Sequence, residues 1–324
     1  MRTVSNELRP LHVYAEIPGP TQRALIPAPQ VSQHHWHPAI ATLLGWHGHP
    51  ADDASVVDFL RLAVARQIDL SQLRYIGTES TPAWCVLPLA SGPTAVCWQL
   101  SGGPPSEAAT QAVDTLLFLR QQLKPAGVQV LQATVDAADR ISRDICLAAG
   151  LSELATLHYL EKRLRIAPPL PMPPGYRFLP YSQETHRLFI QALEQSYVET
   201  GDCPELAGVR ATADVLESHK TAGLRFDPDC WQLLMHEDDT VGVVLSHDSV
   251  RADSFEVGYL GLSKTYRGKG LGRLLLSASM HLAVRRKRPL LALALDASNS
   301  SASKLYYRAG MKRTQTRLAM WARL

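Results

Sequence analysis

The hydrophobic pattern is clearest in the last third of the chain, where a strand, a glycine-rich turn and a helix are predicted in succession. Residues 259–262 form a short apolar stretch that is typical of a strand. Three glycines follow within five positions, and residues 289–296 form a nearly continuous apolar run that suits a buried strand. Between them, apolar residues recur with helical spacing at Leu274, Leu275, Ala278 and Leu282. This region is therefore predicted to be an α/β unit.

Similar patterns predict further elements along the whole chain. Residues 91–93 (Ser-Gly-Pro) are expected to form a turn, and residues 237–239 (Glu-Asp-Asp) a solvated hairpin turn rather than a metal site. The pattern predicts helices at residues 55–65, 107–124 and 184–197, and strands at residues 83–89, 94–100 and 176–179.

A proline-rich segment divides the chain into two parts. Residues 166–175 contain five prolines, which exclude a helix or a sheet interior and favour a stiff, extended spacer. A length of 324 residues is comfortable for two domains. We therefore predict a first domain at residues 1–165, a linker at 166–175 and a second domain at 176–324.

The two parts show an internal repeat at a constant offset, which aligns residues 131–164 with residues 291–324. This alignment gives eight identities without a gap. Chance matches are common in sequence rich in leucine and alanine, so the eight identities alone do not establish a repeat. The chain length and the central linker support the same conclusion. Together these features predict two copies of one fold. The identical pairs are Leu131 and Leu291, Asp136 and Asp296, Ala137 and Ala297, Ala149 and Ala309, Gly150 and Gly310, Thr156 and Thr316, Arg163 and Arg323, and Leu164 and Leu324.

Residues 267–272, Arg-Gly-Lys-Gly-Leu-Gly, have the features of a phosphate-binding turn. Glycine permits unusual dihedral angles and a close approach of the backbone to a ligand. The first N–H groups of a helix have no partner within the helix, and the helix dipole favours an anion there. The turn does not match the Walker loop, which needs Ser or Thr at position 270, or the dinucleotide fingerprint, which needs Gly or Ala where Arg273 stands.

The pattern that fits is Arg/Gln-x-x-Gly-x-Gly/Ala, and here the chain resembles the GNAT acetyltransferases. A second motif of that family, Asn-x-x-Ala-x-x-Leu-Tyr-x-x-x-Gly-Phe, is similar to residues 299–311, with Met311 in the place of phenylalanine. The arrangement in two halves, together with residues 295–299, is similar to that of the mycothiol synthases, which are tandem acetyltransferases. The resemblance implies two tandem GNAT folds of the α/β (α+β) class, each a mixed, mostly antiparallel central sheet flanked by helices.

The alignment of the repeat also separates the two halves. It places residues 107–112, Glu-Ala-Ala-Thr-Gln-Ala, against the glycine-rich turn, and it places Asp139 against Asn299 and Cys146 against Tyr306. The glycines are missing, and Glu107 would set a negative charge beside a pyrophosphate. We therefore expect the first half to be a degenerate copy that does not bind acetyl-CoA in the usual way.

In the second half, the resemblance implies an acetyl-CoA site. Tyr306 matches the tyrosine that many members place near the sulfur as a general acid, with aromatic packing as the alternative. Glu256 lies near the offset of the catalytic glutamate of histone acetyltransferases, so it is either the general base or an exposed residue at a strand end. Asn299 would bind the pantetheine arm, or else cap the helix that begins near Ser300. The remaining residues implied for the cofactor are Leu260 and Leu262, through their backbone, and Arg267, Gly268, Lys269, Gly270, Leu271 and Gly272.

The acceptor pocket is expected in the loop at residues 200–210, where such folds build it. Asp202, Glu205 and Arg210 would orient a polar substrate there. The alternative is that these residues cap the helix predicted at 212–220 and bond locally. Because pocket loops diverge on a shared fold, the acceptor itself is not identified.

Composition and charge limit the partners and the cellular location that we expect for this protein. Hydrophobic residues make up 46% of the chain, and the formal charge of +3 is too mild to imply nucleic acid. The N-terminus has no apolar signal segment and no stretch approaches 18 uninterrupted apolar residues, so we expect a cytoplasmic protein without membrane contact. The five scattered cysteines predict reduced thiols. Histidines 34, 35, 37, 47 and 49 are expected to lie in a partly exposed loop rather than to bind a metal.

These observations predict an acetyl-CoA-dependent N-acetyltransferase (EC 2.3.1.-) that uses no metal. The acetyl group would pass by direct attack to a primary amine of a small molecule or a protein. One alternative is a non-catalytic acyl-CoA binding or sensing protein, which would bind without turnover. Another is a nucleic-acid-binding protein that uses Arg285 to Arg288, which would require salt-dependent affinity.

Overall fold

The structure is a computed structural model and describes residues 24–45, 49–91, 93–100, 108–206, 208–221, 225–249, 251 and 253–324. Its helices are α1 (Trp36–Leu44), α2 (Asp53–Arg66), α3 (Ala109–Leu123), α4 (Arg140–Ala148), α5 (His186–Tyr197), α6 (Thr212–Lys220), α7 (Leu271–Arg285) and α8 (Ser300–Arg308). Its strands are β1 (Arg74–Gly77), β2 (Pro82–Ser91), β3 (Thr94–Leu100), β4 (Val130–Asp136), β5 (Ser152–Arg163), β6 (Tyr176–Pro180), β7 (Trp231–His236), β8 (Asp239–Asp248), β9 (Ser254–Leu262), β10 (Leu290–Asp296) and β11 (Lys312–Arg323).

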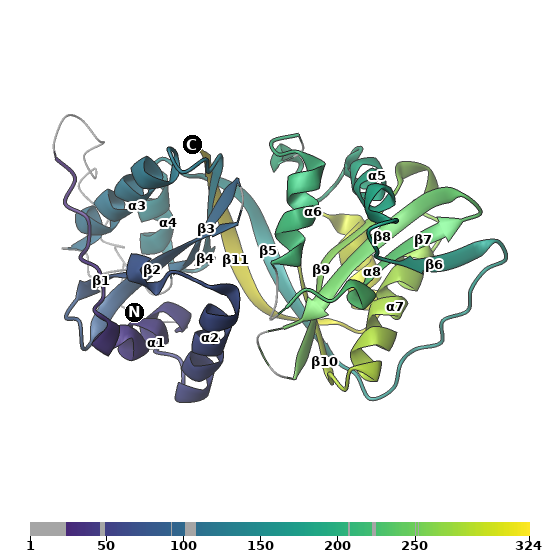
Figure 1. The fold of residues 1–324 in the computed structure, drawn as a ribbon, viewed down its shortest axis with the longest axis horizontal. Coiled ribbons are helices and arrows are strands. Elements are labelled where there is room, and N and C mark those ends of the chain that lie inside the picture. The colour runs from purple at the N-terminus through teal and green to yellow at the C-terminus, as the bar shows by residue number, and fades with distance from the viewer. Residues whose placement is uncertain are drawn as a thin grey trace, which may run out of the picture.

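The described strands form one 11-stranded sheet with the order β1-β2-β3-β4-β11-β5-β10-β9-β8-β7-β6. The pairs β3·β4 and β9·β10 are parallel, and the other pairs are antiparallel. Two strands are exchanged between the halves: β5 lies between β10 and β11, and β11 lies between β4 and β5. Figure 1 shows these two long strands running side by side through the middle of the molecule. Each half therefore depends on a strand from the other half to complete its sheet.

The register of the sheet repeats at the same offset as the sequence. The repeat holds in the parallel pairs beside the centre and in the antiparallel pairs that join the halves. Because side chains alternate between faces, a one-residue slip would move every side chain to the other face, so an identical register gives both halves the same inward positions. The matching pairs are Thr94 with Val130 and Ser254 with Leu290, Cys97 with Ala133 and Val257 with Leu293, and Val130 with Arg323 and Leu290 with Arg163.

Helices cover both faces of the sheet. In the second half, α5 lies on one face, where Ser196 is close to Gly261, and α7 lies on the opposite face, where Leu275 is close to Gly242. Figure 1 shows α5 and α6 on one side of this half of the sheet and α7 on the other, and in the first half it separates α3 and α4 from α1 and α2 in the same way. Apolar clusters lie beneath these helices and around the sheet.

The predicted fold class is confirmed, since the chain has a mixed, mostly antiparallel sheet flanked by helices in a tandem arrangement. The segment at 166–175 contains neither helix nor strand. One local prediction was wrong, because His34 and His35 lie in a 3-10 turn and His37 lies in α1, not in a loop. Pro38 is in the first turn of α1, where a missing N–H costs nothing, and so it does not prevent the helix. His47 lies outside the described residues.

Within the described residues, no helix has both the length and the hydrophobicity that a membrane crossing would need.

Candidate active site

Strands β9 and β10 separate halfway along β9. Their parallel pairing ends at Val257 and Leu293, whereas β9 continues to Leu262. Gly258 forms a β-bulge at this point, because the register of β9 against β8 shifts by one residue. The extra residue bends the strand, and an opening results between the second half of β9 and β10.

The polar backbone groups of Leu260 and Leu262 point toward this opening. The N–H of Ser263 donates to the carbonyl of Val241 at 2.9 Å, so these two residues form a hydrogen-bonded pair of the antiparallel β8·β9 ladder. Bonded and non-bonded pairs alternate along such a ladder. Leu260 and Leu262 are therefore in non-bonded pairs, and their N–H and C=O groups point away from β8, to the side from which β10 has departed.

The glycine-rich turn follows directly and ends at the first turn of α7. Gly268 and Gly270 have φ angles of 76° and 79°, in the left-handed region that favours glycine. A Cβ at either position would meet no atom within 4 Å, so the backbone conformation and not lack of space demands glycine here. In the described structure, no acceptor is found for the N–H groups of residues 270–272. These groups and the positive end of the helix dipole form a site for an anion.

Arg267 braces this turn. Its guanidinium donates to the backbone carbonyls of Leu262 (3.1 Å), Glu199 (3.0 Å) and Ser196 (2.8 Å). The side chain thus ties the end of β9 to the end of α5, and its hydrogen-bonding groups are directed at protein carbonyls. Lys269, by contrast, is exposed beside the turn, and its Nζ atom lies 5.0 Å from the centre of the Tyr266 ring.

The start of α8 lies next to the opening. Asn299 is the N-cap of α8, since its Oδ1 accepts from the N–H of Ala302 at 3.0 Å, as the alternative interpretation of this residue predicted. Tyr306 is buried, and no hydrogen bond of its hydroxyl to another described residue is found. Burial and the charge of Asp202 raise the pKa of Tyr306, so the phenol stays protonated at neutral pH.

Asp202 lies in the loop after α5, close to the end of β10. The carboxylate oxygens of Asp202 and Asp296 and the Sγ atom of Cys203 lie within 4.8 Å of one another. The N–H of Cys203 donates to Asp296 at 3.2 Å, and Gly201 packs against the side chain of Asn299. The loop is therefore fixed against the turn between β10 and α8. Two carboxylates and a thiol are ligand types for a metal, but acidic groups also gather without one, so the absence of a metal stays a prediction.

The other two residues predicted for the acceptor differ in their contacts. Arg210 donates to Thr94 of the first half at 2.8 Å, so it joins the two halves instead of capping α6. Burial lowers the pKa of Arg210. Glu205 is exposed, and no ion pair is found for it among the described residues. A second contact between the halves lies nearby, where Arg66 donates to the carbonyl of Lys220 at 3.2 Å.

Glu256 lies before the bulge, on the face of the sheet that α5 covers. One of its oxygens accepts from the hydroxyl of Ser249, and the other lies 3.9 Å from Nε2 of His247. Its side chain is 40% exposed, so the carboxylate remains accessible. The charge of Glu256 helps to raise the pKa of Tyr159, whereas the charge that acts on Tyr306 is that of Asp202.

Sequence reasoning missed two groups near this face. Tyr159 comes from the exchanged strand β5, where it pairs with Ala294 of β10, and its neighbour Arg317 lies 5.6 Å from its ring. His219 of α6 lies 6.1 Å from the ring of Tyr259, and burial, with His247 and Arg210, lowers its pKa to about 4. No local sequence signal marks either residue, because a strand exchange and a helix contact bring them here.

The remaining candidates in the sequence have structural partners. In the basic run, Arg286 pairs with Asp248 and Asp227, and Arg288 pairs with Asp248, at distances of 2.6 to 2.8 Å. His35 lies 3.5 Å from Glu79, and His37 lies 3.5 Å from Asp53. The two arginines are therefore engaged in ion pairs, and the two histidines each lie beside a separate carboxylate and not in a shared site.

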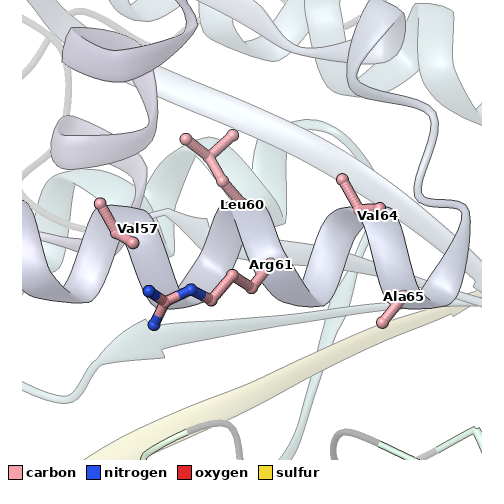
Figure 2. Close-up of a pocket in the computed structure, with 5 residues that line it drawn as sticks. All are labelled: Val57, Leu60, Arg61, Val64 and Ala65. Atoms are coloured by element: carbon pink, nitrogen blue, oxygen red, sulfur yellow. The ribbon is translucent and has the colours of Figure 1, made fainter.

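A surface hollow of about 440 Å³ lies along α2 in the first half, far from this chemistry in the sequence. Figure 2 shows the five side chains that line it, Val57, Leu60, Arg61, Val64 and Ala65. Its walls are almost entirely apolar and offer no acid, base or nucleophile, so we do not assign the active site to it.

Comparison with known proteins agrees with this geometry. Residues 191–311 match the model of the acetyltransferase (GNAT) family. No curated protein matches the sequence. The GCN5-related N-acetyltransferase from Sphaerobacter thermophilus is 20% identical and superposes with a TM-score of 0.64, covering 91% of this chain and 94% of its own. A tandem GNAT protein from the clavulanic acid biosynthesis pathway is 15% identical, with a TM-score of 0.55 and coverage of 90% and 94%.

At these identities the two structures show the fold, and the family match supplies the assignment for the residues that it covers. The matched segment contains the opening between β9 and β10, the glycine-rich turn and Tyr306. Residues 191–311 thus form a domain of the GNAT acetyltransferase family, within a chain that has a tandem GNAT fold.

Proposed function

We propose that this protein transfers an acetyl group from acetyl-CoA to a primary amine by direct attack, in its C-terminal half. The observation that carries the proposal is the opening after Val257 and Leu293, which leads onto the unbonded N–H groups of residues 270–272. An extended ligand with a pyrophosphate fits this arrangement, because the turn can hold the anion while the backbone of β9 bonds a pantetheine arm. The residues present therefore fit acetyl-CoA, which supplies an activated acyl group as a thioester.

The cofactor residues divide into those that bind and those that shape the turn. Gly270, Leu271 and Gly272 would donate N–H groups to the pyrophosphate, and Lys269 would add charge from solvent. Arg267 would act by bracing the turn, since its guanidinium is already bonded to three carbonyls. Gly268 supplies the left-handed backbone, and Asn299 would position the start of α8 beside the pantetheine.

Tyr306 would act as the general acid. Its hydroxyl has no partner among the described residues, and its raised pKa keeps the proton in place until a stronger base appears beside it. A phenol in this position can donate to a leaving sulfur as the carbon–sulfur bond breaks. The N–H groups of β9 beside the bulge would stabilise the negative charge that develops on the thioester oxygen.

The acceptor would be a cationic amine of a small molecule or of a protein. Asp202 and Glu205 have no ion-pair partner among the described residues, and Glu256 is accessible. Such carboxylates near the opening attract an ammonium group and favour its retention. Arg210 would shape the pocket through its contact with the first half. Arg286 and Arg288 form ion pairs with acidic residues of this chain, which supports a protein without a nucleic-acid partner. We propose that the protein acts in the cytoplasm.

The experiment is release of CoA thiol with a panel of primary amines, comparing wild type, Tyr306→Phe and Tyr307→Phe. We expect Tyr306→Phe to lower kcat by on the order of 100-fold without changing the Kd of acetyl-CoA. Tyr307 is 44% exposed on the same helix, so Tyr307→Phe should have wild-type kinetics. Tight binding of acetyl-CoA with no turnover on any amine would instead support an acyl-CoA sensor.

A further inference from the structure

We propose that Asp202 is the general base of the C-terminal site and takes the proton from the acceptor amine. The inference rests on the acetyl transfer proposed above and names a residue for a step that Glu256 was expected to perform. Its basis is the position of the carboxylate at the edge of the opening, between the end of β10 and the start of α8.

The loop that carries Asp202 is held against the catalytic side of α8. Gly201 lies against Asn299, the N-cap of α8, and the N–H of Cys203 bonds to Asp296 at 3.2 Å. A Cβ at Gly201 would lie 3.3 Å from the Asn299 side chain, so a larger residue would require the loop or that side chain to shift. Asp202 is thus fixed relative to the helix that presents Tyr306.

Three tyrosines from three different elements respond to the charge of Asp202. It raises the pKa of Tyr306 on α8, of Tyr197 on α5 and of Tyr259 on β9, in addition to the larger effect of burial on each. A carboxylate oxygen of Asp202 lies within 4.8 Å of one of Asp296 at the end of β10. Asp202 is therefore at the edge of the opening, next to the start of α8.

The carboxylate of Asp202 is also able to accept a proton there. Its side chain remains accessible to solvent, and no lysine or arginine among the described residues pairs with it. Partial withdrawal from water raises its pKa, and Asp296 adds to the rise, although the backbone N–H of Asp296 acts in the opposite direction. A carboxylate with a raised pKa is a better base at neutral pH than an ordinary one.

Glu256 has different surroundings. The hydroxyl of Ser249 and the ring of His247 hold its carboxylate on the other side of the bulge. Its charge acts on Tyr159 and not on Tyr306. Because its carboxylate already accepts from Ser249 and lies beside His247, we assign Glu256 to a remote part of the acceptor and not to the reacting nitrogen.

The proposed step balances without a further reagent. The bound ammonium group first releases one proton to solvent and becomes a neutral amine. As this neutral nitrogen forms its bond to the thioester carbon, a second proton passes from it to Asp202. The carbon–sulfur bond breaks, and the sulfur takes a proton from Tyr306. The products are an amide and the free thiol, and the proton on Asp202 returns to the phenolate through solvent.

The test compares wild type with Asp202→Asn, Asp202→Ala and Glu256→Gln, using the best acceptor from the amine panel. We expect kcat/KM at pH 7 to fall at least 100-fold in Asp202→Asn and less than 10-fold in Glu256→Gln. Added formate should restore part of the rate in Asp202→Ala, which a merely structural role would not allow. The Kd of acetyl-CoA, measured by calorimetry, should stay within about 3-fold of wild type in all variants.

The pH profile supplies the second readout. Asp202 must be ionised to act, so the wild-type rate should fall on the acid side, at a pH above the ordinary pKa of an aspartate, and Asp202→Asn should lack this limb. An Asp202→Asn variant that keeps its rate within 3-fold of wild type would overturn the assignment, and so would loss of the acid limb in Glu256→Gln. If the wild type acetylates no amine, the proposed function fails first and the inference fails with it.

Discussion

The two halves of this protein share a scaffold and differ in a few backbone positions. Helices α4 and α8 both begin with a capped turn, at the equivalent positions Asp139 and Asn299. Both end at a glycine in the left-handed region, Gly150 with φ 77° and Gly310 with φ 82°. The difference begins at the preceding helix, because α7 starts after a left-handed glycine whereas α3 starts after Ala108.

The parallel strand pairs of the two halves also differ in how far their pairing extends. In the second half, the pairing of β9 with β10 ends at Val257 and Leu293. In the first half, β3 pairs with β4 again after a shift in register, at Leu100 and Val135. The first half has therefore closed the gap that the second half keeps open. The comparison shows that apolar alternation is enough to build the sheet, while the proposed acetyl-CoA site depends on a bulge, a turn and the first residues of one helix.

The most drastic way to test the comparison is to separate the halves. Residues 166–324 alone lack β5, which lies between β10 and β11, so we expect this fragment to lose cooperative unfolding and acetyl-CoA binding. Co-expression with residues 1–165 should restore both. The measurements are circular dichroism during thermal unfolding, and calorimetry. A fragment that binds acetyl-CoA as tightly as the full chain would show that the exchanged strand is dispensable.

The next test places the same residue at equivalent positions of both halves. Gly270→Ala should weaken acetyl-CoA binding at least 10-fold, because alanine in the left-handed region costs roughly 1–2 kcal/mol and displaces the N–H groups of the turn. Thr110 is the equivalent position of the first half and lies within α3, so Thr110→Ala should leave the Kd unchanged. Titration calorimetry on both variants decides the matter, and an equal loss in both would contradict the assignment of the site to one half.

A smaller effect is expected from the pH dependence of stability. His219 has a pKa of about 4 in the folded protein, below its ordinary value of 6.5. Its contribution is therefore complete above pH 6.5 and is lost as the pH falls from 6.5 to about 4, since the unfolded chain takes up a proton that the folded site resists. The lost free energy of unfolding is roughly 2–3 kcal/mol.

The matched control for this effect is His219→Phe, which copies Phe59, the residue at the equivalent position of the first half. Urea unfolding of both proteins between pH 4 and pH 7 gives the difference. The variant should lose less stability than wild type over this range, and parallel curves would count against a neutral, enclosed His219.

The smallest effect concerns the apolar side of α2. Val64 is 81% exposed and belongs to the hollow in Figure 2. Val64→Lys should change the free energy of unfolding by less than about 0.5 kcal/mol and leave acetyl transfer unchanged. A clear loss of activity in the thiol-release assay would show that the first half contributes to function through this surface.

Much of the fold could be predicted because helices, strands and turns follow from local patterns of apolar residues and glycines. The apolar run at 289–296 and the glycines at 268–272 predicted the elements around the site. Less of the candidate site could be predicted from local patterns. Asn299 has the short polar side chain of a helix cap, and its cap was anticipated, whereas the bonds of Arg267 to Ser196 and Glu199 join segments far apart in the sequence and leave no local signature.

The sequence by itself determined the elements around the site, the internal repeat and the place of the glycine-rich turn, because side-chain periodicity and glycine act within a few residues. Only the tertiary structure decided that β5 and β11 change places, that Arg210 reaches Thr94 and that Asp202 lies beside Asp296. The physical reason is that such neighbours are set by how strands pair and loops pack across long stretches of chain, and many sequences satisfy the same local pattern while packing differently.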